Sequence, residues 1–230
     1  MALYALIPAA GAGTRLRGET PKQYLPLAGM PMLWHAVTSV SEAPIESVFV
    51  VLAPGDRQFA QHDWSAFAGR LEPLYCGGET RRDTVYNGMV AAMAAVDADD
   101  WILVHDAARP CLPRADLASL IRETGDDRVG GILALPIVET VKRAAKDEAG
   151  MQRITGTEDR SQLWLAQTPQ MFRCGLLLEA LQKAKVAVTD EAGAVEQMGL
   201  RPRLVTGSRE NIKVTFAEDL KIAEAILARR

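Results

Sequence analysis

Short apolar runs alternate with amphipathic segments along this chain. Five runs have the length and the turn-forming boundaries of buried strands. They cover residues 3–7, 48–53, 101–104, 132–135 and 203–206. Between several of them, apolar residues recur at three- and four-residue spacing, which predicts helices within 31–40, with Pro31 in the first turn, and within 85–96, 117–121 and 220–227. This alternation predicts an α/β fold with a mostly parallel sheet, helices on both of its faces, and ligands at the carboxyl ends of the strands.

One segment, residues 136–164, breaks the alternation with a charge-rich stretch, PIVETVKRAAKDEAGMQRITGTEDRSQLW. Its β-favouring parts, 139–143 and 152–156, flank a polar turn at 146–150, which predicts an extended hairpin or arm. We therefore expect a single domain over 1–230 with an arm at about 136–163. A two-stranded arm is marginally stable alone, so we expect it to lie on another surface such as a second subunit. The composition also allows a loose surface excursion.

The composition limits the possible partners. The chain of 230 residues carries 26 Lys and Arg against 29 Asp and Glu, a net charge of −3, which excludes a protein that coats nucleic acid or an acidic membrane. No apolar run is long enough to span a membrane, and the first ten residues lack the basic residues of a secretory signal, which indicates the cytoplasm. Cys76, Cys111 and Cys174 are scattered without a C-x-x-C pair, so we expect reduced thiols rather than disulfides or a zinc site.

A loop of small and basic residues follows the first predicted strand. Residues 7–29 read IPAAGAGTRLRGETPKQYLPLAG. Small side chains let backbone N–H groups approach a phosphate closely, and Arg15 and Lys22 add positive charge. The small residues are Ala9, Ala10, Gly11, Ala12 and Gly13. The pattern predicts a site for a small anion, while a tight strand–helix turn would use the same residues.

This loop fails to match either common nucleotide-binding motif. The dinucleotide fingerprint G-x-G-x-x-G begins at Gly11 but has Leu16 at its third glycine, which disfavours a dehydrogenase. The P-loop pattern begins at Gly13 but has Glu19 in place of the lysine that meets the β- and γ-phosphates. An anionic side chain at that position would repel the nucleotide.

The same loop is the first of several stretches that resemble one enzyme family. AAGAGTRL and PKQYLPLAG, within residues 9–29, are similar to the signature of the 2-C-methyl-D-erythritol 4-phosphate cytidylyltransferases of the non-mevalonate isoprenoid pathway. Six further stretches match in order: GGETRRDTV (77–85), VHDAARP (104–110), ETVKR (139–143), TEDRSQLWLAQTPQMF (157–172), TDEAGAVEQMG (189–199) and ENIKVTFAEDL (210–220). The resemblance covers essentially the whole chain, and its departures, at Thr84, Glu139 and Ala217, remove no charge that the chemistry needs.

The resemblance implies a Rossmann-like nucleotidyltransferase fold and a reaction between CTP and 2-C-methyl-D-erythritol 4-phosphate. The products would be 4-diphosphocytidyl-2-C-methyl-D-erythritol and pyrophosphate, formed by in-line attack of the acceptor phosphate on the α-phosphorus of CTP. A phosphate monoester with a second pKa of ~6 is largely ionised at neutral pH, so no protein base is required. Catalysis would consist of charge neutralisation and alignment by fixed cations and Mg²⁺.

The resemblance also implies roles for individual residues. Arg15 and Lys22 would contact the triphosphate and stabilise the transition state. Arg160 and Lys213 would hold the acceptor phosphate for attack. The backbone of residues 9–13 would enclose the nucleotide, and a loop before a helix would contact its cytidine through Gly78, Glu79 and Thr84.

Further residues are implied at the active site. Asp106 lies at the carboxyl end of the predicted strand 101–104 and would be the Mg²⁺ ligand, with a turn-forming Asp as the alternative. Arg109 would contact the acceptor, with a surface salt bridge as its alternative. Thr168 would be another substrate contact, although a Thr before Pro is commonly an extended strand end. Thr140 and Arg160 would reach the active site of the neighbouring subunit, so activity would require a homodimer.

Two other titratable residues lie near these motifs. Asp219 could be proposed as a second metal ligand, but residues 215–218 predict a capping box that leaves Asp219 in the first turn of a helix. The histidines show no metal-ligand spacing, and only His105, beside Asp106, could touch the pocket.

Three other functions stay open on the sequence alone. A ribitol-5-phosphate cytidylyltransferase would use a similar short polyol phosphate. A catalytically silent nucleotide-binding module would keep the fold. The joint presence of five charged residues of the site argues against it: Arg15, Lys22, Asp106, Arg160 and Lys213. A dehydrogenase is disfavoured by Leu16.

Overall fold

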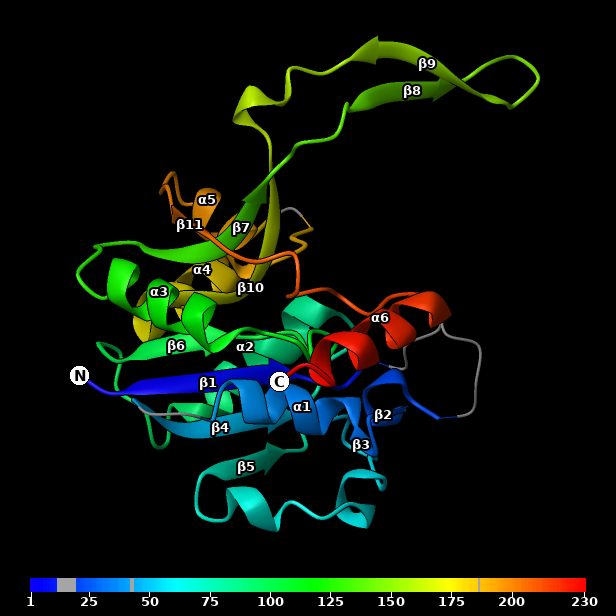
Figure 1. Cartoon of the computed structure of the whole chain (residues 1–230). Coiled ribbons are helices and arrows are strands. Elements are labelled where there is room, and N and C mark those ends of the chain that lie inside the picture. Colours follow the sequence, from blue (N-terminus) through cyan, green and yellow to red (C-terminus); the bar gives the residue numbers. More distant parts are fainter. Residues whose placement is uncertain (12–19, 42–43, 186) are drawn as a thin grey trace.

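Within the described residues, 1–11, 20–41, 44–185 and 187–230, the computed structural model has a seven-stranded sheet (Figure 1). Across the sheet the strands are β11 (Arg203–Thr206), β7 (Gly130–Pro136), β10 (Trp164–Arg173), β6 (Trp101–Val104), β1 (Leu3–Pro8), β4 (Ile45–Val51) and β5 (Leu71–Leu74). In this described sheet β10 pairs antiparallel with β6 and β7, and the other pairs are parallel. The predicted mostly parallel sheet is confirmed.

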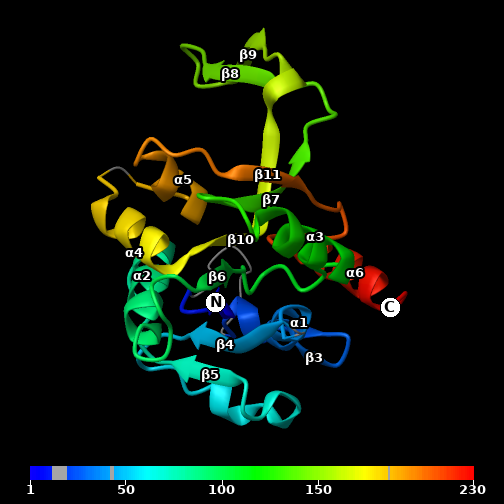
Figure 2. The ribbon, with the colours of Figure 1, turned by 90° about the vertical axis from the view of Figure 1, so that its left-hand side faces the viewer.

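Helices cover both faces of the sheet (Figure 2). Because side chains alternate along a strand, β1 buries Leu3, Ala5 and Ile7 on one face and Leu6 on the other. The first face packs against α1 (Met32–Ser39) and α3 (Arg114–Thr124). The second face packs against α2 (Arg81–Ala92), α4 (Cys174–Lys183) and α5 (Glu191–Glu196). No helix of the described ranges is long and apolar enough to cross a membrane.

All five apolar runs overlap strands of the sheet. Those at 101–104 and 203–206 coincide with β6 and β11. β1 is one residue longer than its run, and β7 is three residues longer than its run. The run at 48–53 is displaced from its strand, because β4 begins at Ile45 and ends at Val51. The pattern did not reveal β10, since Gln167, Thr168 and Gln170 interrupt its apolar residues.

The predicted helices are present, but three of their ends are displaced. Pro31 immediately precedes α1 instead of lying in its first turn. The segment 85–96 overlaps α2, which begins earlier, at Arg81, and ends at Ala92. Val96 is buried from the loop after the helix, so its apolar character reports burial rather than helix. The four-residue spacing from Ala92 to Val96 therefore matched a helical pattern, although Val96 lies in a loop.

The last helix, α6 (Ala217–Leu227), packs against the small hairpin of β2 (Pro26–Leu27) and β3 (Met30–Pro31). The capping box expected over 215–218 is shifted by one residue. The Asp219 carboxylate accepts the backbone N–H groups of Thr215 and Phe216 at 2.7 and 2.8 Å. Asp219 therefore caps the helix, as expected of a structural residue.

The arm is a two-stranded hairpin that extends away from the sheet (Figure 1). Its strands are β8 (Lys142–Lys146) and β9 (Gln152–Thr157). The second strand lies where the sequence predicts it, but the first begins three residues later than the expected stretch 139–143. Asp147 explains the shift: its carboxylate accepts the N–H groups of Ala149 and Met151, which closes the hairpin at this point.

The three cysteines are free thiols, as the sequence predicts. Burial raises the pKa of Cys111 to about 11 and that of Cys174 to about 12. Neither side chain is therefore a thiolate at neutral pH.

Candidate active site

A cavity of about 480 Å³ opens at the carboxyl edge of the sheet. Its walls come from the segments that follow β1, β5 and β6, where a ligand is expected in a fold of this kind. Nine of the predicted site residues line it: Ala9, Ala10, Gly11, Lys22, Gly78, Glu79, Thr84, Asp106 and Lys213.

A second cavity, of about 690 Å³, shares a wall with the first. Lys213 lines both cavities, and Arg109 lines the second. Other walls of the second cavity come from β10 and from Val138 and Glu139 at the base of the arm. Two spaces that share one lysine can hold two anionic groups close together.

The loop between β5 and α2 approaches the end of β1 closely. A Cβ at Gly77 would collide with Ala10, and a Cβ at Gly78 would collide with Asp83, so only glycine allows this approach. The Thr84 hydroxyl accepts the N–H of Gly78 at 3.2 Å. Thr84 therefore holds the loop in place as well as lining the cavity.

Lys22 begins η1 (Lys22–Tyr24), a 3-10 turn that is fixed at two points. The buried Gln23 side chain donates to the carbonyl of Ala9 at 2.7 Å, which ties η1 to the end of β1. The Tyr24 hydroxyl donates to the Asp56 carboxylate at 2.8 Å. The backbone that carries Lys22 is thus held against the cavity. Gln23 lies beside Lys22 in PKQYLPLAG, and its neutral side chain gave no signal of this role.

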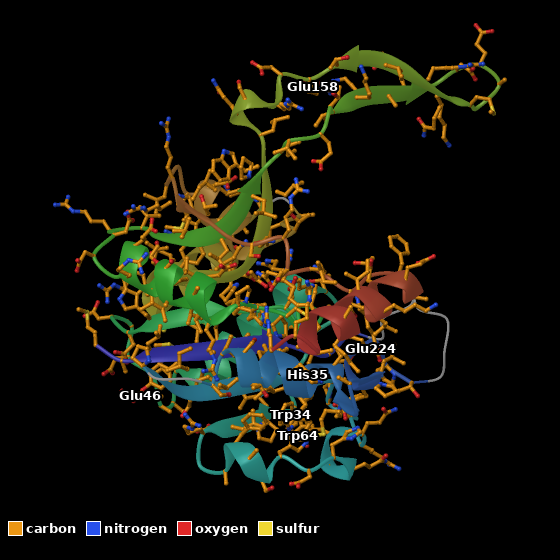
Figure 3. The ribbon with its side chains drawn as sticks, in the orientation of Figure 1. Trp34, His35, Glu46, Trp64, Glu158 and Glu224 are labelled. Atoms are coloured by element: carbon orange, nitrogen blue, oxygen red, sulfur yellow. The ribbon has the colours of Figure 1, made fainter. Side chains whose placement is uncertain are left out.

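An aromatic cluster supports η1 from the segment between β4 and β5. Phe59 of η2 (Phe59–Gln61) stacks on Trp64 at 4.5 Å, and Trp34 contacts Phe67 of η3 (Ser65–Phe67) at 5.5 Å. Figure 3 shows Trp34 and Trp64 together on the side of α1 that faces β5. The segment reaches η1 through Asp56, the partner of Tyr24.

Asp106 lies two residues beyond β6, and its buried carboxylate faces three cations. Oδ1 accepts from Arg81 Nε at 3.0 Å, while Oδ2 lies 2.8 Å from Lys213 Nζ and 3.8 Å from Arg109 Nε. Burial alone would raise the pKa of Asp106, but the three cations together hold it well below its usual value. The carboxylate is therefore ionised at neutral pH.

A buried hydrogen-bond chain fixes the backbone at Asp106. Its N–H donates to the Thr168 hydroxyl at 2.9 Å, and this hydroxyl lies 3.2 Å from His105 Nδ1. Burial lowers the pKa of His105 to about 4, so the ring is neutral and Nε2 donates to the carbonyl of Arg109 at 3.0 Å. Thr168 and His105 line neither of the two cavities, so the structure gives Thr168 a supporting position behind Asp106.

Arg109 is buried, which rules out the surface salt bridge considered from the sequence. Its Nη1 donates to the carbonyl of Asn211 at 2.6 Å. Burial lowers the pKa of Arg109, Asp106 opposes that shift, and Arg81 adds to it. The guanidinium is a fixed cation on the wall of the second cavity.

Sequence reasoning missed two charged residues of the site, Arg81 and Glu191. Arg81 lines the first cavity and joins Asp106 to the buried Glu191. Both residues lie in stretches that carry the resemblance, GGETRRDTV and TDEAGAVEQMG, and that was the available signal. Each also begins a helix, where a charged residue is common and draws no attention.

Some predicted site residues lie elsewhere. Thr140 and Arg160 are exposed at the base of the arm and line neither cavity of their own chain. Arg160 begins η4 (Arg160–Gln162) and donates to the carbonyl of Val138. Arg15, Ala12 and Gly13 lie outside the described residues.

The donor groups fit a metal that binds mainly through substrate. The described residues contain no group of three or more His, Cys, Asp or Glu that could hold a metal ion. Mg²⁺ usually takes one or two protein carboxylates and fills its other positions with phosphate oxygens and water. Asp106 offers one ionised carboxylate at the cavity, and Lys213, the partner of Oδ2, is half-exposed.

Comparison with known proteins agrees with this geometry. Residues 3–229 match the family described as IspD: 2-C-methyl-D-erythritol 4-phosphate cytidylyltransferase. The chain belongs to this family. The protein of that name from Dechloromonas aromatica is 53% identical over 229 residues, which cover 99% of this chain and 98% of the relative. That from Nitrosomonas eutropha is 52% identical over 229 residues, covering 98% and 97%.

Solved structures agree with the fold across the full length. A 4-diphosphocytidyl-2C-methyl-D-erythritol synthase is 39% identical and superposes with a TM-score of 0.83, covering 98% of each chain. The 2-C-methyl-D-erythritol 4-phosphate cytidylyltransferase of Thermus thermophilus is 30% identical, with a TM-score of 0.76 and complete coverage of both chains. The chain therefore shares the fold of these structures as well as their sequence features.

Proposed function

We propose that this chain transfers the cytidylyl group of CTP to 2-C-methyl-D-erythritol 4-phosphate and releases pyrophosphate. The observation that carries the proposal is that Lys22, Asp106 and Lys213 line one cavity, in a chain that belongs to this family over residues 3–229. The relatives' names supply the identity of the acceptor. The chain acts as one domain over 1–230, and its free cysteines suit a reducing compartment such as the cytoplasm.

The first cavity binds CTP. The small residues that end β1 bring backbone N–H groups to the triphosphate: Ala9, Ala10 and Gly11, continued by Ala12 and Gly13. The cytosine lies against the loop of Gly78 and Glu79, which Thr84 holds in place. With CTP bound in this way, its phosphates lie near Lys22 and near Arg15, which the resemblance assigns to the triphosphate.

The acceptor phosphate binds where the two cavities meet. Lys213 lines both, so its ammonium can neutralise the attacking phosphate and the α-phosphate together. Arg109 holds the acceptor from the second cavity. Thr168 contributes indirectly, because its hydroxyl holds the backbone of Asp106 in place. The nucleophile is already an anion, so these residues align and neutralise the reactants instead of removing a proton.

Asp106 would hold Mg²⁺ when the nucleotide is bound. The ion supplies charge neutralisation of the phosphates, and the protein supplies one ionised carboxylate with a fixed backbone. The Lys213 side chain is half-exposed and long enough to turn from Oδ2 of Asp106 toward the substrate phosphates, which would leave that oxygen to the ion.

The arm completes the site of a second subunit in a homodimer. Thr140 and Arg160 lie at the base of the arm, exposed and outside the cavities of their own chain. A hairpin with exposed faces gains stability by lying on another surface. In the dimer, Arg160 and Thr140 contact the acceptor bound by the partner, and neither nucleic acid nor a membrane takes part.

The test is an assay of pyrophosphate release with two acceptors. The purified chain is incubated with CTP, Mg²⁺ and either 2-C-methyl-D-erythritol 4-phosphate or ribitol 5-phosphate. We expect turnover with the first acceptor and little with the second. Preference for ribitol 5-phosphate, or no turnover with either, would overturn the proposal.

A further inference from the structure

Arg81 presents two different edges to two carboxylates. Its forked end meets Glu191, with Nη1 2.6 Å from Oε1 and Nη2 3.1 Å from Oε2. Its Nε and its Nη2 each lie 3.0 Å from Oδ1 of Asp106. Arg81 therefore engages both oxygens of Glu191 but only one oxygen of Asp106.

The positions of Arg81 and Glu191 are each energetically unfavourable for a single charged side chain. Arg81 is the first residue of α2, and a cation at a helix N-terminus is disfavoured by the helix dipole. Glu191 is 1% exposed, and burying a carboxylate is costly unless it is paired. Each cost is offset by the pairing of these two residues.

Glu191 is held in place independently of Arg81. Gln170 on β10 accepts the N–H of Ala192 at 2.8 Å and donates to Asp190 at 2.9 Å. Asp190 in turn accepts the N–H of Gly193 at 3.0 Å. The start of α5 is thus attached to the sheet, so Glu191 is the fixed partner and Arg81 the side chain that it directs.

We propose that Glu191 is a positioning residue of the nucleotide site, which holds the forked end of Arg81 so that one oxygen of Asp106 stays available to the cavity. Without Glu191, Arg81 would turn its fork onto both oxygens of Asp106, as arginine–carboxylate pairs prefer. The oxygen now facing Lys213 would then be lost to the substrate side. This inference rests on the proposed function in one respect, the assignment of the metal–nucleotide complex to Asp106.

The test uses Glu191→Gln, with Glu196→Gln as the matched control. Glu196 ends the same helix, is exposed, and loses the same charge without touching Arg81. Affinity for CTP is measured by titration calorimetry with Mg²⁺ and with EDTA, on protein shown to be folded by circular dichroism. Losses of about 10–100-fold are typical when the partner of a metal ligand is removed.

For Glu191→Gln we expect CTP affinity to fall about 10-fold or more with Mg²⁺ and to change less than about twofold in EDTA. Glu196→Gln should match wild type in both. Unchanged affinity with Mg²⁺ would overturn the inference, as would an equal loss with and without Mg²⁺, which is the result of a merely structural role.

Arg81→Lys gives an independent check, because lysine keeps the charge but lacks the planar fork that contacts both oxygens of Glu191. The double variant Arg81→Lys/Glu191→Gln should bind CTP with Mg²⁺ about as weakly as Arg81→Lys alone, and additive losses would count against the proposal. None of these titrations contains the acceptor. Wild-type protein that binds CTP but forms no product would defeat the proposed function and leave this inference standing.

Discussion

Positive side chains outnumber the carboxylates around Asp106. Arg81, Arg109 and Lys213 face it, and Glu191 is the second carboxylate of the network. These five groups leave one positive charge in excess, and the charges of Lys22 and Glu79 on the same cavity wall offset one another. A cavity of this charge favours an anionic ligand, because a buried surplus of charge is stabilised by the opposite sign.

Lys22→Ala tests the charge that η1 carries. We expect kcat to fall about 10²–10³-fold, the usual effect of losing one strong electrostatic contact in the transition state. The backbone should stay in place, because Gln23 and Tyr24 hold η1 without the lysine. Steady-state assays with CTP and 2-C-methyl-D-erythritol 4-phosphate measure the change.

Lys221→Ala is the matched control for this substitution. Lys221 is exposed on α6 and lines neither cavity, so its loss removes the same charge without touching the site. We expect its kcat to equal that of wild type. Similar kcat for both variants would contradict the role of Lys22.

His105 should make the stability of the fold depend on pH. Its pKa falls from 6.5 to about 4 on folding, so between these values the unfolded chain binds a proton that the native chain does not. The free energy of unfolding therefore decreases as the pH falls through this range, by about 2 kcal/mol from His105 between pH 7 and pH 5. Asp106 adds little between pH 7 and pH 5, because both its ordinary pKa of 3.8 and its lower folded pKa lie below this interval.

His105→Gln should remove this contribution, since an amide does not titrate. We expect urea unfolding of the variant to show a change between pH 7 and pH 5 that is smaller than that of wild type by about 2 kcal/mol. Parallel pH dependences for the two proteins would show that His105 is not buried in its neutral form.

The sequence indicated most of the cavity but not the contacts behind it. Residues that carry a recognisable local feature, such as Lys22 in a loop of small residues or Asp106 at a strand end, could be predicted. Glu191 could not, because its function depends on Arg81, which lies 110 positions away. Contacts over such distances are set by the order of strands in the sheet, which no local pattern records. Arg15 stays a prediction from the resemblance.

At the scale of elements, burial on both faces made strands predictable. β1 and β6 are continuous apolar runs because helices cover both sides of them. β10 has the same central position but carries Gln167, Thr168 and Gln170, whose hydrogen bonds hold Asn211, Asp106 and α5 around the site. The strand that organises the site is therefore the one whose pattern is least strand-like.

Thr80→Ala tests the start of α2, the helix that carries Arg81 and Thr84. The Thr80 hydroxyl accepts the N–H of Asp83 at 3.1 Å and so satisfies one free donor of the first turn. We expect the substitution to lower the free energy of unfolding by about 1 kcal/mol, measured by urea denaturation. Thr80→Ser keeps the hydroxyl and should cost only a few tenths of that, so equal losses in both variants would rule out capping.

At the scale of the whole molecule, the arm distinguishes this chain from a closed α/β unit. The charge-rich composition of 136–164 predicted a hairpin, and the structure contains one, displaced only in its first strand. Both strands of the arm are exposed almost throughout, so the hairpin can lie on a further surface. A second subunit is the expected partner, and that expectation has a direct consequence for activity.

Mixed dimers test whether the arm serves the neighbouring site. Lys22→Ala and Arg160→Ala should each be nearly inactive, one through the cavity of its own chain and the other through the arm. In a mixed dimer, one site pairs the intact cavity with the intact arm, and the other site contains both substitutions. After random exchange of equal amounts, half of the dimers are mixed, so about a quarter of all sites should be active.

A second mixture separates this effect from any other gain on mixing. Lys22 and Lys213 line the same cavity, so every dimer formed from Lys22→Ala and Lys213→Ala has a defect in both of its sites. That mixture should recover no activity, whereas the mixture with Arg160→Ala should approach a quarter of the wild-type rate. Subunit exchange is verified with two affinity tags. If exchange occurs and neither mixture recovers activity, Arg160 acts within its own chain, and the arm must fold back on the sheet from which it extends.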